Sequence, residues 1–341
     1  MDVKLDFSDV LIQPVFSKVE SRKNVMLDMT YGFKYSTKTL SCVPIMAANM
    51  DTTGTIGVMK ELVKENMFTC LHKFITDEDV LENEDFLKDH IDNFAFTIGY
   101  SDDGIERLKR FQEILDFKVI CIDIANGYLS GFVDFCRKVR EQFPDKIIIA
   151  GNVCTEDGVK TLVENGKVDV VKCGIGGGSA CTTRIKTGVG FPQFSSAAEC
   201  SLMAKKLGAK IVSDGGITCP GDLSKAFGVG SDFVMMGGQF AGHEENPGNL
   251  IEEDGKRFKE FWGMSSEHAM NKNYGEKKSY RTSEGRHIKI PYKGNIKDTL
   301  DDFLGGLRST CTYTNNYYLE EMIGSVIFLR VNNQYNSSLV K

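Results

Sequence analysis

The chain has 341 residues, of which 41% are hydrophobic, and a formal net charge of −6. That length and hydrophobic content can bury a large core, whereas the acidic balance disfavours a nucleic-acid-binding surface, which needs a basic patch. The start, Met1-Asp-Val-Lys-Leu-Asp, lacks the features of a secretory signal, and no apolar run reaches membrane-spanning length. We therefore expect a cytoplasmic protein with neither a membrane nor a nucleic acid as partner.

Eight segments are predicted to be buried parallel strands, because each is a short apolar run bounded by turn residues. In chain order they cover residues 43–51, 67–73, 93–99, 119–125, 146–153, 168–174, 209–216 and 232–238. Segments with helical apolar spacing lie between them, among them 56–64, 104–115, 131–143 and 197–207. Gly166 and Gly230 are placed where helices end, and Pro220 where a helix begins. This alternation predicts one α/β domain over residues 1–341, a (β/α)8 TIM barrel.

The loop after the sixth strand is the most informative part of the chain. Residues 172–184 read Lys-Cys-Gly-Ile-Gly-Gly-Gly-Ser-Ala-Cys-Thr-Thr-Arg, so Cys181 follows a run of glycines whose amides can point at an anion. A flexible loop with a bystander cysteine is the simpler interpretation. Because catalytic groups collect at the carboxyl ends of barrel strands, the position favours a covalent nucleophile beside a phosphate site.

Two later strand ends extend the predicted phosphate site. Ser213-Asp-Gly-Gly216 closes the seventh strand and Met236-Gly-Gly238 closes the eighth, where barrels often bind phosphate through loop amides. Asp214 is then placed to accept hydrogen bonds from ribose hydroxyls. A tight turn explains either Gly-Gly pair alone, but the two pairs together favour a phosphorylated sugar or a nucleotide as ligand.

After the eighth strand, residues 242–294 depart from the barrel pattern and are rich in Lys, Glu, Gly, Ser and His. Such a long excursion predicts an inserted, extended active-site loop that serves as a lid or binding loop. Two stretches within it, Gly263-Met-Ser-Ser266 and Tyr280-Arg-Thr-Ser-Glu-Gly285, carry polar groups that can meet a base. Glu284 is a candidate proton donor or acceptor, although an exposed loop glutamate is the commoner case.

Ten cysteines are spread along the chain, most of them within predicted strands and helices. In a chain without a secretory signal this distribution indicates free thiols rather than a disulfide framework. Six of them are expected to be small apolar core residues, namely Cys42, Cys70, Cys121, Cys136, Cys173 and Cys200.

Several short motifs are distributed along the chain. They are the Cys181 loop with Gly188-Val-Gly-Phe-Pro-Gln193, Ala47-Ala-Asn-Met-Asp-Thr52, Ser213-Asp-Gly-Gly216, Gly263-Met-Ser-Ser266 and Arg308-Ser-Thr-Cys-Thr312. Together they resemble the IMP dehydrogenase/GMP reductase family over nearly the whole chain, from Val3 to Arg330. There is no room for the paired regulatory domains or the Arg-Tyr flap of the dehydrogenases, and Ser283-Glu-Gly285 is similar to the reductase form of that loop. The reductase branch is therefore favoured.

This resemblance implies an NADPH-dependent conversion of GMP to IMP with release of ammonia. Cys181 would attack C2 of the purine, and loss of ammonia would leave a covalent thioimidate, which a hydride then reduces. Thr183 and Glu284 match the pair that handles protons in the ammonia step. Lys73 and Asp123 complete the implied catalytic set.

The resemblance also implies ligand contacts, residue by residue. Nucleotide contacts fall on Ser179, Asp214, Gly215, Gly216, Gly237, Gly238, Gly263, Met264, Ser265, Arg281, Thr282, Ser283 and Gly285. NADPH contacts fall on Ser21, Arg22, Lys73, Asp123, Ile124, Ala125, Ile175, Gly176, Met264, Tyr280, Arg281, Ser309, Thr310, Cys311 and Thr312. Residues 309–312 would come from a neighbouring subunit of a homotetramer, with Arg22 and Ser309 placed to meet a 2′-phosphate. A potassium ion would lie at Gly176, Gly178, Cys181 and Arg184.

Three departures from the family pattern weaken the cofactor contacts more than the catalytic ones. Gly177 stands where proline is usual, Ile217-Thr218 replaces a segment that often contains cysteine, and Phe74 and Ile75 replace polar residues after Lys73. Two alternatives stay open. One is a dehydrogenase without its regulatory insert, which would convert IMP to XMP with NAD, and the other is a nucleotide-binding barrel that senses purines without turnover.

Overall fold

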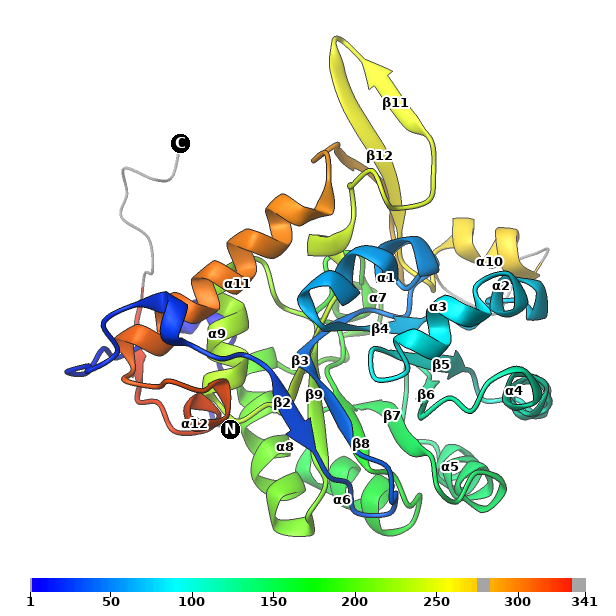
Figure 1. The fold of residues 1–341 in the computed structure, drawn as a ribbon, viewed down its shortest axis with the longest axis horizontal. Helices are drawn as coiled ribbons and strands as arrows, with labels where there is room; N and C mark the ends of the chain where they lie inside the picture. Colours follow the sequence, from blue (N-terminus) through cyan, green and yellow to red (C-terminus); the bar gives the residue numbers. More distant parts are fainter. Residues whose placement is uncertain (1, 275–282, 333–341) are drawn as a thin grey trace.

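Eight parallel strands close into a barrel in the computed structural model, which describes residues 2–274 and 283–332 (Figure 1). The strands are β3 (Leu40–Ala47), β4 (Met67–Leu71), β5 (Phe94–Ile98), β6 (Val119–Asp123), β7 (Ile147–Val153), β8 (Val170–Cys173), β9 (Lys210–Asp214) and β10 (Phe233–Met236). Each pairs with the next, and β10 pairs in parallel with β3 through Val234 and Ile45, which closes the ring. The predicted TIM barrel is confirmed.

Seven of the eight predicted strands run past the observed ones at their carboxyl ends, whereas the predicted strand 146–153 ends with β7 at Val153. The interval 43–51, for example, includes four residues beyond β3, because the chain leaves the sheet after Ala47 to line the mouth of the barrel. At the other end, β3 begins earlier than predicted. A short strand, β2 (Met29–Tyr31), pairs antiparallel with Leu40–Cys42 and extends it.

Helices alternate with the strands around the outside of the barrel (Figure 1). The helices that follow the first seven barrel strands are α1 (Ile56–Leu62), α2 (Asp77–Glu82), α3 (Glu84–Asp89), α4 (Asp102–Ile114), α5 (Ser130–Gln142), α6 (Glu156–Glu164), α7 (Thr183–Thr187), α8 (Gln193–Leu207) and α9 (Pro220–Gly228). After the last strand come α10 (Glu267–Tyr274), α11 (Ile296–Tyr313) and α12 (Leu319–Met322). Pro220 occupies the first turn of α9, and Gly166 and Gly230 follow the ends of α6 and α9 as predicted.

The amino end of the barrel is closed by β2. The Tyr31 ring lies 4.4 Å from that of Phe233, and its hydroxyl donates to the Asp232 carbonyl at 2.7 Å. Above this floor, apolar side chains such as Met46 and Phe68 fill the interior. The barrel is therefore packed from below, and a ligand can enter only at the carboxyl ends of the strands.

Residues 242–294 form more regular structure than a loop. They contain an antiparallel sheet of β11 (Leu250–Glu253), β12 (Lys256–Trp262) and β13 (His287–Pro291). The β11–β12 hairpin stands out from the barrel, at the top of Figure 1. The sequence does not predict these strands, because β11 and β13 are short and mostly exposed and β12 mixes charged and aromatic residues without a regular period.

The two ends of this insertion are fastened together at the barrel. Lys293 N donates to the Gly242 carbonyl at 2.9 Å, and Glu244 N donates to that of Gly294 at 2.9 Å. The buried ring of His243 lies within 3.3 Å of the Gly294 carbonyl and 3.1 Å of the Thr299 hydroxyl. The insertion thus enters and leaves at one point.

The chain ends meet outside the barrel. Strand β1 (Val10–Ile12) pairs antiparallel with β14 (Phe328–Arg330), beside α9. The short helix η2 (Arg22–Asn24) packs against α11. Within residues 2–274 and 283–332, none of the helices has both the length and the apolar character of a membrane span.

We predict that His243 makes the stability of the protein pH-dependent. Burial lowers the pKa of His243, so the imidazole is protonated at a higher pH in the unfolded chain than in the folded chain. The stabilisation that neutral His243 gives the folded state is therefore lost as pH falls below about 6.5. His243→Gln should lower the free energy of unfolding at pH 7.5. The difference in unfolding free energy between the variant and the wild type, measured in urea titrations, should be smaller at pH 5.5. A difference that stays constant between the two pH values would contradict this role.

Candidate active site

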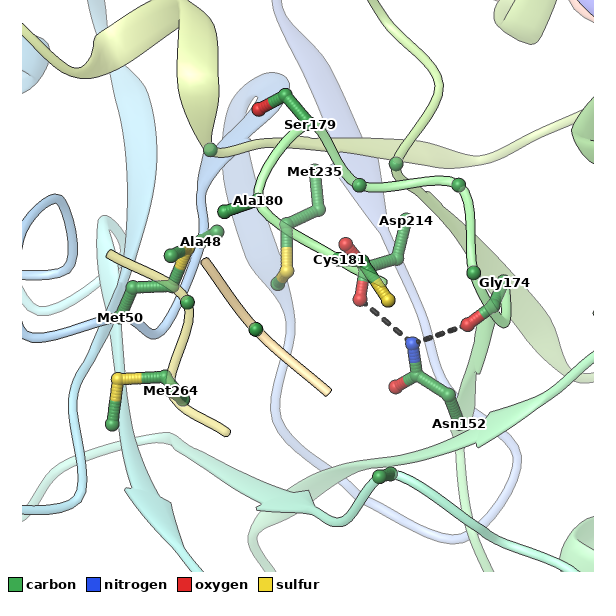
Figure 2. A pocket seen from close by; sticks show the side chains of 18 of the residues that line it. Ala48, Met50, Asn152, Gly174, Ser179, Ala180, Cys181, Asp214, Met235 and Met264 are labelled. Atoms are coloured by element: carbon green, nitrogen blue, oxygen red, sulfur yellow. Dashed lines mark hydrogen bonds between the residues drawn. The ribbon is translucent and has the colours of Figure 1, made fainter. Parts of the chain in front are cut away.

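A cavity opens at the carboxyl ends of the barrel strands. It is lined by loops that follow five of the barrel strands, by Asn152 within β7, and by Phe261, Gly263–Ser265 and Glu284–Gly285 of the insertion. Figure 2 shows Met50, Met235 and Met264 on one side of it and Asp214 and Asn152 on the other. One wall is therefore soft and apolar, and the opposite wall is polar.

The loop after β8 carries Cys181 into this cavity. Gly174, at its start, has a φ of +148°, and a Cβ there would lie only 2.1 Å from the Asp214 carbonyl oxygen. Only glycine fits this approach, which turns the chain directly over the end of β9. The half-buried Cys181 then lies in a tight turn, with its amide donating to the Gly178 carbonyl at 3.0 Å.

The segment by which the insertion returns to the barrel, residues 283–286, pairs with the loop after β8, and we call it the return arm. Thr182 N donates to the Glu284 carbonyl at 2.8 Å, and Arg286 N donates to the Ala180 carbonyl at 3.0 Å, so that Cys181 lies opposite Gly285. The Gly263 amide donates in turn to the Arg286 carbonyl at 3.0 Å. These bonds bring Glu284, distant in sequence, beside the cysteine.

Three side chains form a hydrogen-bonded chain at this point. The thiol of Cys181 donates to the Thr183 hydroxyl, with 3.2 Å between Sγ and Oγ1. The same hydroxyl donates to Oε2 of Glu284 at 2.7 Å. A proton can therefore pass between the sulfur side of the cavity and a carboxylate without leaving the chain of hydrogen bonds.

The loops predicted to hold phosphate converge on the same mouth. The Gly216 amide donates to the Gly177 carbonyl at 3.0 Å, which joins the loops after β9 and β8. Ser179 packs so closely on Gly238 that a Cβ there would lie 2.3 Å from its hydroxyl oxygen. Gly215 and Gly237 line the cavity with them, so the structure brings these predicted residues together.

A buried ammonium lies under the polar wall. Lys172 is 1% exposed, and its Nζ bonds to Asp123 and lies 3.2 Å from Asn49 Oδ1 and 3.3 Å from Asp214 Oδ2. Burial alone disfavours its charge, but the Asp123 and Asp214 carboxylates outweigh burial and raise the pKa of Lys172. Burial likewise opposes the charge of Asp123, but Lys172 outweighs it and lowers the pKa of Asp123. Both groups are therefore charged.

Asn152 links this wall to the cysteine loop (Figure 2). Its Nδ2 donates to Asp214 Oδ2 and to the Gly174 carbonyl, both at 2.8 Å. Sequence reasoning assigned no role to Lys172, Asn49 or Asn152. Lys172 and Asn152 lie within predicted apolar strands, whereas the motif from Ala47 to Thr52 did contain Asn49.

The segment around Met264 is held by contacts with Asp51 in the loop after β3. The Trp262 indole donates to Asp51 Oδ1 at 2.8 Å, and the Asp51 amide lies 3.4 Å from the Met264 sulfur. Ser265 lines the cavity next to Met264. The Ser283 hydroxyl donates to the Gly285 carbonyl at 3.1 Å.

The residues expected to contact NADPH divide into two groups. One group lines the cavity, namely Asp123, Ile124, Ala125, Ile175, Gly176 and Met264. The other does not line it, namely Ser21 and Arg22 at η2, Lys73 after β4, and Ser309 to Thr312 on α11. Tyr280, Arg281 and Thr282 lie outside the described residues.

Two residues of the second group have other contacts within the chain. Cys311 is fully buried, and the Thr310 hydroxyl donates to that of Ser224 at 2.9 Å. Arg184, expected near the potassium ion, bonds to Asp6 at 3.2 Å and to the Phe191 carbonyl at 2.6 Å. Its side chain also packs on Gly176.

The fold and this site together define a TIM-barrel enzyme with a thiol hydrogen-bonded to a Thr–Glu pair beside glycine-rich loops. The chain belongs to the IMP dehydrogenase/GMP reductase family, since its residues 4–337 match the IMP dehydrogenase / GMP reductase domain.

Curated relatives cover almost the full chain. Human GMP reductase 2 is 47% identical over 98% of this chain and 96% of its own length. GMP reductase of Caenorhabditis elegans is 46% identical over 99% and 94%, and that of Aliivibrio salmonicida is 46% identical over 98% and 97%. The similarity thus extends through the barrel, the insertion and both ends.

We predict that Cys181 is the thiol most reactive to iodoacetamide. Eight of the ten cysteines are buried, leaving Cys181 and Cys219 partly accessible, and burial raises the pKa of the Cys311 thiol to about 12. Peptide mass spectrometry should therefore find Cys181 labelled first and protected by GMP, with Cys219 unprotected. Preferential labelling of Cys311 would show that the thiol environment is not as described.

Proposed function

We propose that this protein is a GMP reductase, which converts GMP and NADPH into IMP, ammonia and NADP+. The observation that carries the proposal is the hydrogen-bonded chain from Cys181 through Thr183 to Glu284 at the mouth of the barrel. A nucleophile, a proton carrier and a carboxylate in this order suit a displacement in which ammonia must leave.

The first half of the reaction removes the amino group. The Cys181 thiolate adds to C2 of GMP, and the C2–N2 bond then breaks. Thr183 and Glu284 deliver the proton that the departing nitrogen needs to leave as ammonia. The product of this half is a thioimidate that joins the Cys181 sulfur to C2.

The second half restores the thiolate. NADPH, when bound, supplies the hydride that reduces C2 of the thioimidate. The C2–S bond then breaks, IMP leaves, and Cys181 regains its electron pair. Pairing of Thr182 and Ala180 holds the return arm beside the half-buried sulfur, and a nucleotide and a nicotinamide bound there would limit attack by water and hence formation of XMP.

The two walls of the cavity suit the two parts of the nucleotide. Asp214 accepts hydrogen bonds from the ribose hydroxyls, and the amides near Ser179, Gly216 and Gly238 hold the phosphate. The purine lies between this wall and the three methionines, whose polarisable sulfurs pack well on a ring. Ser265, Ser283 and Gly285 are close enough in the fold to contact its edge.

NADPH suits the part of the mouth next to Cys181. Asp123, Ile124 and Ala125 line the cavity there, while Arg22 and Ser309 lie on neighbouring elements elsewhere on the chain. In a homotetramer the segments that carry Arg22 and Ser309 would reach the site of an adjacent subunit, where these two residues would meet the 2′-phosphate. Exposed Phe16, Tyr313 and Ile327 on the same terminal segments support such an interface.

A potassium ion suits the cysteine loop. Carbonyl oxygens of Gly176, Gly178, Cys181 and Arg184 are neutral ligands of the kind that replaces the hydration shell of this ion. The ion would order the turn that carries the nucleophile. We also propose a cytoplasmic location for the enzyme.

One assay separates this function from its rivals. Oxidation of NADPH should depend strictly on GMP, with IMP and ammonia formed in equal amounts. Faster formation of XMP from IMP and NAD would identify a dehydrogenase, and nucleotide binding without any turnover would identify a sensor.

We predict that Cys181→Ala abolishes GMP reduction while GMP still binds, because the phosphate and ribose contacts do not involve the sulfur. Turnover is followed at the NADPH absorbance band and binding by calorimetry. The matched control is Cys219→Ala, which removes the other partly accessible thiol and should keep normal turnover. Intact turnover in Cys181→Ala would exclude the covalent route.

A separate prediction concerns proton transfer. Thr183→Ala and Glu284→Gln should each lower kcat by roughly two to four orders of magnitude, with small changes in GMP affinity. Thr187→Ala on the same short helix is the control, since its hydroxyl donates to the Thr183 carbonyl and accepts from the Val189 amide but contacts neither Cys181 nor Glu284. Variants that lose affinity but retain kcat would mean that the pair only binds substrate.

A further inference from the structure

Lys172 connects parts of the cavity that face different ligands. It lies on β8 immediately before the cysteine loop, and its buried ammonium contacts Asp123 on β6 and Asp214 on β9. Asp123 belongs to the part of the mouth proposed for NADPH, and Asp214 to the part proposed for ribose. One cation therefore serves two carboxylates, and removing it would leave both without their partner.

The bonds to Asp214 all fall on one of its oxygens. Oδ2 of Asp214 accepts a hydrogen bond from Nδ2 of Asn152 at 2.8 Å and lies 3.3 Å from Nζ of Lys172. Across the part of the chain that the structure describes, Oδ1 accepts no hydrogen bond. The carboxylate is thus fixed through its inner oxygen, and the other is left for a ligand diol.

We propose that Lys172 is a positioning residue that holds the ribose-binding and cofactor-side carboxylates together. It orients Asp214 toward the nucleotide ribose and Asp123 toward the cofactor. This inference rests on the proposed function for the identity of the two ligands. It deepens that function by assigning the orientation of both carboxylates to a single, almost fully buried side chain.

A second buried lysine provides a matched control. Lys146 is fully buried and bonds to Asp116, whose side chain is 68% exposed. It directly precedes β7, at the amino end of the barrel and opposite the cavity. Lys146→Met removes a comparable buried ammonium without touching the site.

The experiment measures binding without turnover. Calorimetry gives the affinities of Lys172→Met, Lys172→Arg, Lys146→Met and the wild type for IMP, for its 2′,3′-dideoxy analogue, and for NADPH with IMP present. Lys172→Met should weaken IMP binding about 10- to 100-fold, the range for hydrogen bonds to a charged group. Binding of the dideoxy analogue should change little, and NADPH binding should weaken at least several-fold.

The other variants decide whether the effect is specific. Lys172→Arg should recover most of the affinity for both ligands, whereas Lys146→Met should lower the melting temperature and leave both affinities unchanged. If Lys172→Met does not fold, Lys172→Met/Asp123→Asn removes the pair together and should still lose the preference for IMP over the dideoxy analogue. Retention of that preference in Lys172→Met, or in Lys172→Met/Asp123→Asn, would overturn the inference.

Failure of the proposed function would look different. A wild-type protein that binds IMP and NADPH but does not reduce GMP would contradict the activity alone. A wild-type protein that reduces GMP without preferring IMP over its dideoxy analogue would contradict the role of Lys172 alone.

Discussion

The site depends above all on the backbone pairing between the cysteine loop and the return arm of the insertion. Without the bonds from Thr182 and Arg286, Glu284 would be an ordinary exposed side chain of a polar segment. A weak carboxylic acid becomes a candidate proton carrier only when its distance to the reacting group is fixed. The barrel supplies one half of this arrangement, and the insertion supplies the other.

The polar wall solves a different problem, which is how to keep two carboxylates charged in a sheltered place. Lys172 neutralises them from below, so their outer oxygens remain usable at the surface of the cavity. Because the ammonium is enclosed, its attraction is screened by solvent much less than that of a surface pair. Asn152 then couples this wall to the start of the cysteine loop.

Sequence reasoning was sufficient for the barrel, because its strands are buried on both faces and appear as continuous apolar runs. It also placed the Gly174–Thr183 loop and Asp214 at one mouth, since strand ends of a barrel share a face. It could not reveal the β11–β13 sheet, because β11 and β13 are short and mostly exposed and β12 mixes charged and aromatic residues without a regular period. Nor could it reveal Lys172 or Asn152 as site residues, because a polar residue inside an apolar run shows its partners only in three dimensions.

The fastening of the insertion at its base separates two properties of the molecule. The Gly242 carbonyl accepts from the Lys293 amide, and the Gly294 carbonyl accepts from the Glu244 amide. The two ends of the segment between them are therefore held together, and the segment does not form part of the barrel wall. Changes in the length of the β11–β12 hairpin therefore add little to the entropy of closing the chain. The hairpin can diverge or be exchanged between homologues as a separate module, while the strands beneath it continue to present the same cavity floor.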